Sequence, residues 1–188
     1  MTASEIHPPT PELLRFVHEH RDADVARLLL GKAPAGIDLR VAAAQIAARR
    51  KAKTKLPDWY AAEDLLFPPP LSVEQASSQV TANYKTGLVA GDCLVDLTGG
   101  MGVDTLALAP GFRRVVYVEQ DPELCRCFAY NATRFGVNVE VVNSTAEAFV
   151  AGFRGRAVFY VDPARRDEAR NRVFLFEDCR PSLPELLP

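Results

Sequence analysis

The sequence of 188 residues lacks several features that would fix a class of function at once. It has no hydrophobic run that approaches the roughly 20 residues needed by a membrane-spanning helix. Its N-terminus has neither the basic flank nor the apolar core of a secretory signal. The net charge of −2 argues against a protein that holds nucleic acid by bulk charge, although it is compatible with a local basic patch. These absences predict a cytoplasmic protein without a membrane segment.

Residues that bind metals or form disulfides are also scarce. The four cysteines include no C-x-x-C pair, because Cys125 and Cys127 are separated by a single residue. The three histidines, His7, His18 and His20, are clustered in the N-terminal fifth, in a polar context. The sequence therefore predicts no metal site, and it predicts free thiols in a reducing compartment.

The first part of the chain carries only helix signals. Thr10 followed by Pro11 predicts a helix start, and Asp38 predicts another. Three consecutive prolines then predict a boundary. We expect an all-helical N-terminal region over residues 1–70 and a second unit over residues 71–188.

A basic run, Arg49–Lys55, holds five positive side chains in seven residues near the end of this region. Such a run is usually a solvated helix face, but its field would also attract the phosphates of RNA. Trp59 and Tyr60 follow it, and they either stack on bases or pack in the core.

Past residue 71 the pattern changes to short apolar strands that alternate with helical segments. A helix is expected from a cap at Ser72 to about Lys85. We expect strands near residues 93–97, 114–118, 138–142 and 157–161, and helices near residues 101–109, 121–135 and 145–151. This alternation predicts a mostly parallel sheet with right-handed crossovers. The predicted fold class is α/β with a Rossmann-like sheet.

The segment C-L-V-D-L-T-G-G-M-G predicts a strand that ends in Asp96 and continues into a glycine-rich turn. The next apolar run ends in Glu119, twenty positions after Gly99. A doubly wound sheet places its glycine turn and its ribose-binding acid at this spacing. The alternative interpretation is that these residues form a strand, a tight turn and a helix that bind no ligand.

Two details favour S-adenosylmethionine over a dinucleotide. A carboxylate at Asp96 would repel a pyrophosphate but could face the ammonium of a methionine moiety. No glycine stands at position 105 to complete the spacing G-x-G-x-x-G. The segment resembles motif I of class I methyltransferases, D-x-G-x-G-x-G, in which Asp96, Gly100 and Gly102 match and Thr98 replaces the first glycine.

Polar residues at the ends of the next two strands complete the expected nucleoside site. Glu119 would accept both ribose hydroxyls, unless it is a solvated loop acid. Gln120 would flank the adenine ring. Ser144 would accept a hydrogen bond from the adenine amino group. Alternatively, Ser144 or Thr145 caps the following helix.

Asp162 and Pro163 follow the last predicted strand, where the proline fixes the backbone next to the acid. The pair resembles motif IV of methyltransferases that act on amino groups or nucleic-acid bases, although Ala164 and Arg165 replace the second proline and the aromatic residue of that motif. The resemblance implies that Asp162 orients an exocyclic amine. Arg165 or Arg166 would contact a base or a phosphate, or form a salt bridge within the loop.

Four segments carry a more specific resemblance: Q-A-S-S-Q, N-Y-K, D-L-T-G-G-M-G-V-D and D-P-A-R-R-D. In this order they resemble a bacterial family, common in Bacteroidetes, of uncharacterised class I methyltransferases with a THUMP-like RNA-binding region after the catalytic domain. The likeness covers roughly residues 40–188. More distantly, the layout is similar to trimethylguanosine synthases and other RNA guanine methyltransferases.

The resemblance implies an S-adenosylmethionine-dependent methyltransferase that modifies a base in RNA. Gln75, Ser78 and Lys85 would close over the methionine end of the cofactor, unless they form only the polar face of a helix. The expected cofactor site also includes Asp96, Thr98, Gly99, Gly100, Gly102, Glu119, Gln120 and Ser144, and the expected catalytic pair is Asp162 and Pro163.

The resemblance also implies a sheet of about seven strands, whereas four can be placed, so we expect the chain to be the N-terminal part of a longer protein. Two alternatives remain. One is an NAD-dependent oxidoreductase, which Asp96 and the missing glycine disfavour. The other is a non-catalytic RNA-binding scaffold, which would fit the basic run and the departures at Thr98 and Ala164.

Overall fold

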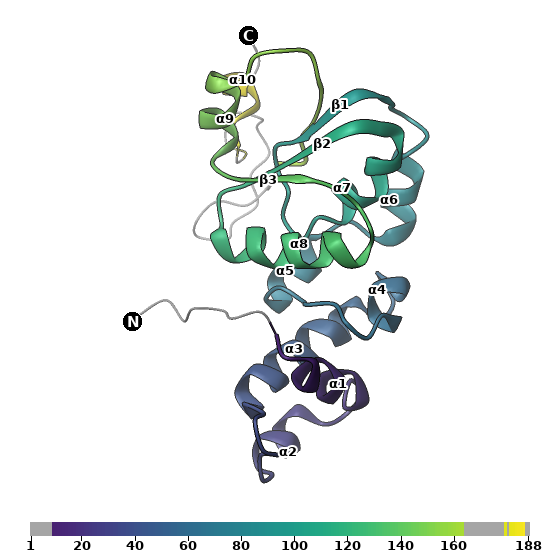
Figure 1. The fold of residues 1–188 in the computed structure, drawn as a ribbon, viewed down its shortest axis with the longest axis vertical. Helices are drawn as coiled ribbons and strands as arrows, with labels where there is room; N and C mark the ends of the chain where they lie inside the picture. Colours follow the sequence, from purple (N-terminus) through teal and green to yellow (C-terminus); the bar gives the residue numbers. More distant parts are fainter. Residues whose placement is uncertain (1–8, 164–178, 180, 187–188) are drawn as a thin grey trace.

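The computed structural model describes residues 9–163, 179 and 181–186. Figure 1 shows an elongated molecule with the first helices at one end and a β-sheet at the other. The predicted contacts of Arg165 and Arg166 lie outside the described residues. Within the described part of the chain, no helix is long and apolar enough to cross a membrane.

The helices that follow Thr10 and Asp38 begin where these caps predict. The bounds of the N-terminal helices are α1 (Pro11–Glu19), α2 (Val25–Leu29), α3 (Leu39–Ala52) and α4 (Pro57–Ala61). Thr10, Asp24 and Asp38 each accept hydrogen bonds from backbone amides of the first turn of α1, α2 and α3. The predicted all-helical start of the chain is confirmed.

The basic run near the end of α3 is used within the protein. Arg49 is fully buried, and its guanidinium donates to the backbone carbonyls of Tyr60, Ala62, Glu63 and Leu65. It therefore holds the segment after α4 in place, and burial lowers its pKa to about 10.

The lysines of the run also have partners. Lys51 pairs with Glu74 at 2.7 Å and Lys53 pairs with Asp22 at 2.7 Å, while Lys55 donates to the carbonyl of Glu74 at 2.6 Å. The three lysines of the run are therefore paired within the protein, and contact of the run with RNA phosphates stays a prediction.

The hydrophobic core continues across the predicted boundary at residue 70. One buried cluster joins Ala48 of α3, Trp59 of α4 and Met101 of the glycine turn. Trp59 therefore packs in the core. The division into units at residue 70 stays a prediction, because these helices and the sheet share apolar contacts.

The single helix expected from Ser72 to Lys85 is two helices, α5 (Pro70–Gln75) and α6 (Gln79–Lys85). Helix α5 starts at Pro70, before the predicted cap. Ala76 is extended, and Ser78 caps the second helix by accepting a hydrogen bond from the Thr81 amide at 3.1 Å. The start of this helix was therefore predicted too late. Its continuity was also predicted wrongly, because Ser78 offers the chain a new helix start.

The sheet contains the four predicted strands, and all their pairings are parallel. They are β1 (Gly91–Asp96), β2 (Phe112–Glu119), β3 (Glu140–Asn143) and β4 (Val158–Tyr160), in the spatial order β3-β2-β1-β4. The connections contain α7 (Val103–Leu108), the 3₁₀ turn η1 (Ala109–Gly111), α8 (Pro122–Arg134) and α9 (Ala146–Gly152), and α10 (Leu183–Leu186) follows later. The predicted α/β class is confirmed.

The alternation of side chains along β1 explains how helices cover both faces of the sheet. Leu94 packs with Leu108 of α7, whereas Val95 packs in the cluster that holds Ala146 of α9. Figure 1 accordingly shows α9 and α10 on one side of the sheet and α6 and α7 on the other.

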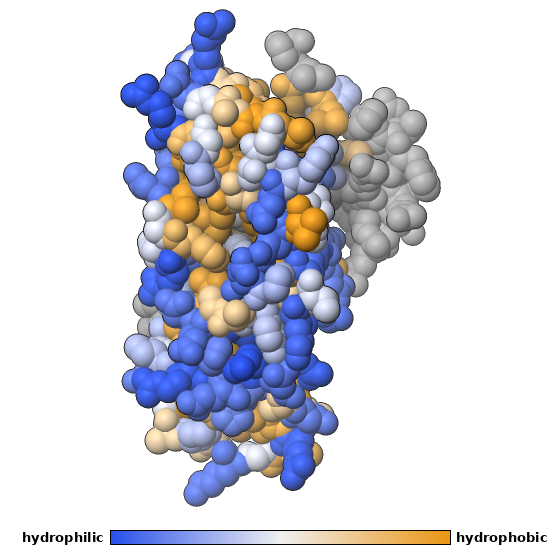
Figure 2. All heavy atoms as spheres, turned by 90° about the vertical axis from the view of Figure 1, so that its right-hand side faces the viewer, coloured by the Kyte–Doolittle hydropathy of each residue, from blue (hydrophilic) through white to orange (hydrophobic). Residues whose placement is uncertain are grey.

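The surface is uneven in hydropathy. Figure 2 shows hydrophobic groups gathered over the end that holds the sheet, while most of the opposite end is hydrophilic on this face. Among the exposed apolar side chains are Val80 and Tyr84 of α6, and Leu88 follows that helix.

Candidate functional site

A cavity of about 950 Å³ opens at the ends of β1, β2 and β4. Chain order reverses at β1, because β2 lies on one side of it and β4 on the other. Open α/β sheets bind ligands in the crevice at such a switch point, outside the carboxyl ends of the strands. The fold therefore places the cavity where a ligand is expected.

The glycine turn between β1 and α7 forms one wall of this cavity, and close packing explains two of its glycines. A Cβ atom at Gly99 would overlap the ring of Tyr117, and one at Gly102 would overlap the ring of Phe128. These two rings are stacked with centroids 3.9 Å apart. Gly102 also has φ +83°, which disfavours any side chain.

Gly100 is different, because a Cβ atom added there would meet no crowded packing. The nearest atom to a Cβ there would be the Thr98 carbonyl oxygen at 3.6 Å, and φ is +53°. The Gly100 amide donates to Glu119 Oε2 at 2.9 Å, and its carbonyl accepts from the Tyr117 hydroxyl at 2.6 Å. Gly100 is therefore held by groups of β2 on both sides of its backbone.

Asp96 lies beneath the turn rather than in the cavity wall. It is 1% exposed, and its two oxygens accept from the Thr98 amide at 3.0 Å and the Thr105 hydroxyl at 2.5 Å. Burial raises the pKa of Asp96 to about 7, although both hydrogen bonds oppose the shift. In this arrangement the carboxyl braces the turn and does not line the cavity.

Glu119 lies at the tip of β2 and does line the cavity. Its Oε2 accepts from the Gly100 amide, and its Oε1 accepts from the Asp121 amide at 2.9 Å. Two backbone groups therefore fix the orientation of this carboxylate.

Thr98 connects the turn to the end of β4. Its hydroxyl accepts a hydrogen bond from the Asp162 amide at 2.8 Å. Thr98, Asp162 and Pro163 all line the cavity. The residue that departs from the glycine pattern thus supplies a contact that a glycine could not make.

Lys85 and Ser78 are committed elsewhere. The Lys85 ammonium donates to Asp104 at 2.9 Å, to the Tyr160 hydroxyl at 2.6 Å and to Ser77 at 3.0 Å. Ser78 caps α6. Neither side chain lines the cavity, whereas Gln75 does.

The ends of β2 and β3 contribute the remaining expected residues. Gln120 and Ser144 line the cavity, as does Thr145. Thr145 caps α9 by accepting from the Ala148 amide at 3.2 Å, whereas the Ser144 hydroxyl donates to the Thr145 carbonyl at 3.0 Å. Of the two candidate caps, Thr145 therefore is the one used.

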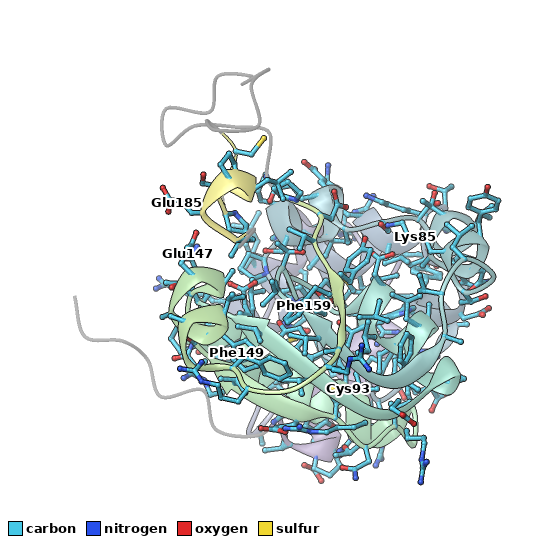
Figure 3. All side chains as sticks on the ribbon, turned by 90° about the horizontal axis from the view of Figure 1, so that it is seen from above. Lys85, Cys93, Glu147, Phe149, Phe159 and Glu185 are labelled. Carbon is cyan, nitrogen blue, oxygen red and sulfur yellow. The ribbon has the colours of Figure 1, made fainter. Side chains whose placement is uncertain are left out.

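All charged side chains among the described residues that line the cavity are carboxylates. They belong to Asp104, Glu119, Glu147, Asp162 and Glu185. Figure 3 shows Glu147 of α9 and Glu185 of α10 close together on one side of the sheet, with Lys85 far across on the other. The described wall therefore favours a positively charged ligand. Within the described residues no group of three or more His, Cys, Asp or Glu is arranged to hold a metal ion.

The structure thus gathers ten of the expected residues around one cavity and leaves three outside its wall. The ten are Gln75, Thr98, Gly99, Gly100, Gly102, Glu119, Gln120, Ser144, Asp162 and Pro163. The three side chains outside the wall make hydrogen bonds to neighbouring backbone and side-chain groups, and they belong to Asp96, Ser78 and Lys85. Sequence reasoning missed Asp104 and Glu147, although both stand in the first turns of helices that follow strand tips, where an acid is favoured by the helix dipole.

A solved structure from Porphyromonas gingivalis W83, provisionally named a methyltransferase, resembles 94% of this chain with 31% sequence identity and a TM-score of 0.69. The chain has a class I methyltransferase fold. It spans 46% of the length of that relative.

Two further likenesses are weaker. An rRNA methylase from Streptococcus thermophilus matches 40% of this chain and 46% of its own, with 18% identity and a TM-score of 0.36. A precorrin 8w decarboxylase from Methanobacterium thermoautotrophicum matches 45% of this chain and 49% of its own, with 24% identity and a TM-score of 0.40. No protein-family model matches the sequence, and no curated protein matches it.

Proposed function

We propose that this chain binds S-adenosylmethionine in the cavity at the carboxyl edge of the sheet, as the cofactor-binding part of a methyltransferase that acts on a base in RNA. The observation that carries the proposal is the fixed carboxylate of Glu119, which lines the cavity beside the glycine turn. The methyltransferase fold and the provisionally named relative support it.

Glu119 suits a ribose. Each of its oxygens already accepts one backbone amide hydrogen bond, from Gly100 or from Asp121. A carboxylate oxygen has a further lone pair, so two acceptor positions remain. The two hydroxyls of a ribose are a matching pair of donors, and hydrogen bonds to a charged acceptor are stronger than neutral ones.

The charge of the cavity wall favours this cofactor over a dinucleotide. S-adenosylmethionine carries a sulfonium and an ammonium against one carboxylate, whereas NAD carries a pyrophosphate. The five charged side chains among the described lining residues are all acids. Asp104 has Lys85 as a partner. A pyrophosphate would meet repulsion there, and a net positive ligand would be attracted.

Asp162 would orient the base that accepts the methyl group. It lines the same cavity as Glu119, and Pro163 follows it. S-adenosylmethionine, when bound, supplies a methyl group already activated on a sulfonium. Asp162 would accept a hydrogen bond from the amino group of a base and so orient that nitrogen, which makes positioning the main contribution of the protein. The choice of an RNA base rests on the resemblance of D-P-A-R-R-D and three other segments to a bacterial methyltransferase family with a THUMP-like RNA-binding region.

Isothermal titration calorimetry with S-adenosylmethionine, S-adenosylhomocysteine and NAD tests the cofactor. We expect micromolar binding of the first two and none of NAD. Glu119→Gln should weaken binding by roughly 100-fold, because it removes charge-assisted acceptors for two hydroxyls. Glu123→Gln is the matched control, because Glu123 is a partly exposed acid near the start of α8 that does not line the cavity.

The other outcomes separate the alternatives. Binding of NAD alone would favour an oxidoreductase, and binding of neither ligand would favour the scaffold. Unchanged affinity in Glu119→Gln would remove Glu119 from the cofactor site. Transfer of a labelled methyl group from S-adenosylmethionine to total bacterial RNA, compared with protein and DNA, tests the acceptor class separately.

A further inference from the structure

Just past the ends of β1 and β4, a side chain makes the hydrogen bond that links the two chain segments. The two strands pair through Asp96 and Tyr160, and the Leu97 amide then donates to the Tyr160 carbonyl at 3.0 Å. In a regular parallel ladder, the Asp162 amide would next donate to the Leu97 carbonyl. It donates to the Thr98 hydroxyl at 2.8 Å. The hydroxyl thus extends the pairing by one bond, at the point where β1 leaves the sheet for the glycine turn.

The buried carboxyl of Asp96 holds the backbone of Thr98. The Thr98 amide donates to Asp96 at 3.0 Å, and the other oxygen of Asp96 accepts from the buried Thr105 hydroxyl. A continuous set of hydrogen bonds therefore runs from α7 through the buried acid to Thr98 and on to Asp162. A glycine at position 98 would end this set at its own amide.

Pro163 restrains Asp162 from the other side. The proline ring fixes its own φ and confines the preceding residue to extended conformations. The Asp162 backbone is then restrained by Thr98 through its amide and by Pro163 through its carbonyl side. Both Thr98 and Asp162 line the cavity beside the glycine turn.

We infer that Thr98 is a positioning residue, whose hydroxyl holds Asp162 in place on the acceptor side of the cavity and is not a ligand of the cofactor. The inference rests on the proposed function for the role of Asp162, but the link between Thr98 and Asp162 can be tested without it. It also explains the departure from the glycine pattern, because the threonine side chain couples the cofactor turn to the acceptor segment.

Amide hydrogen exchange, measured by NMR at Asp162, reports on this link directly. In Thr98→Val, which keeps the shape but lacks the hydroxyl, the Asp162 amide should exchange about fivefold faster or more, as expected for loss of one hydrogen bond. Thr98→Ser should restore slow exchange. Thr98→Ala removes the hydroxyl without a branched side chain and serves if the valine variant folds poorly.

Thr133→Val is the matched control. The Thr133 hydroxyl donates to the Tyr130 carbonyl on the exposed side of α8, away from the cavity wall. This variant should leave the Asp162 amide and ligand affinity unchanged. Affinity for S-adenosylhomocysteine should also stay within about threefold of wild type in Thr98→Val, because the hydroxyl accepts from the Asp162 amide and donates to Asp96 at 3.5 Å.

Methyl transfer to RNA completes the test. Thr98→Val should slow transfer by about tenfold or more at saturating cofactor, and Thr98→Ser should recover it. Unchanged Asp162 exchange in both the valine and alanine variants would overturn the inference, as would a tenfold loss of S-adenosylhomocysteine affinity with the amide still protected. If the wild-type protein binds neither cofactor form, the proposed function fails, whereas the exchange measurement still decides whether Thr98 holds Asp162.

Discussion

Asp96→Asn is expected to change how stability depends on pH while it leaves the glycine turn intact. The carboxyl is 1% exposed, and burial raises its pKa from 3.8 to about 7. An asparagine can accept from the Thr98 amide through its oxygen, and it can donate to the Thr105 hydroxyl through its nitrogen. The substitution therefore removes the ionisation and keeps both hydrogen bonds.

The direction of the effect follows from proton binding. The unfolded chain loses the Asp96 proton near pH 4, whereas the folded protein keeps it until about pH 7. Between these values the folded state binds more protons, so ionisation of Asp96 lowers the free energy of unfolding as the pH rises. The loss is complete above pH 7 and is on the order of 4 kcal/mol for a difference of this size.

Urea unfolding at several pH values between 4 and 8 measures this effect. The free energy of unfolding of Asp96→Asn should rise relative to wild type by up to about 4 kcal/mol across this range. Asp92→Asn is the control and should run parallel to wild type, because the Asp92 side chain is 88% exposed. A constant difference between Asp96→Asn and wild type from pH 4 to pH 8 would refute the account of Asp96 as a buried, neutral brace.

Two further substitutions test the packing around the site and are read by urea unfolding. Gly102→Ala should lower stability by roughly 3 kcal/mol or more, because the new Cβ would overlap Phe128 and φ is left-handed. Gly100→Ala should cost about 1 kcal/mol, because φ is left-handed there too but the nearest atom to the new Cβ is the Thr98 carbonyl oxygen at 3.6 Å. Equal losses would contradict this difference. Arg49→Met should cost about 3 kcal/mol, because buried carbonyls lose their donor, and Arg49→Lys should not restore it; a neutral Arg49→Met would show that the guanidinium is dispensable.

The sequence predicted the four strands because each is a short apolar run with a polar residue or a turn at its end. It also predicted the caps at Thr10 and Asp38, since a single side chain decides each of them. The break at Ser78 was missed, because the residues around it fit one amphipathic helix equally well. That choice depends on the tertiary partner of the Gln79 amide, which donates to the Lys55 carbonyl at 2.9 Å.

The sequence predicted most residues of the candidate site, but it did not predict which of them line the cavity and which are buried behind the wall. Asp96 and Glu119 both end a strand, so the pattern placed both carboxylates in contact with the cofactor. The structure separates them, because Asp96 is covered by Thr98 and Thr105 while Glu119 lines the cavity. The acid at Asp104 was missed because its place in the wall depends on how α7 leaves the turn.

The binding of a nucleoside by Glu119 is the central claim, and a crystal structure with S-adenosylhomocysteine tests it most directly. The account predicts the ligand in the cavity at the ends of β1, β2 and β4, with both ribose hydroxyls within hydrogen-bonding distance of the Glu119 carboxylate. A ligand bound elsewhere, or a ribose that faces away from Glu119, would contradict it.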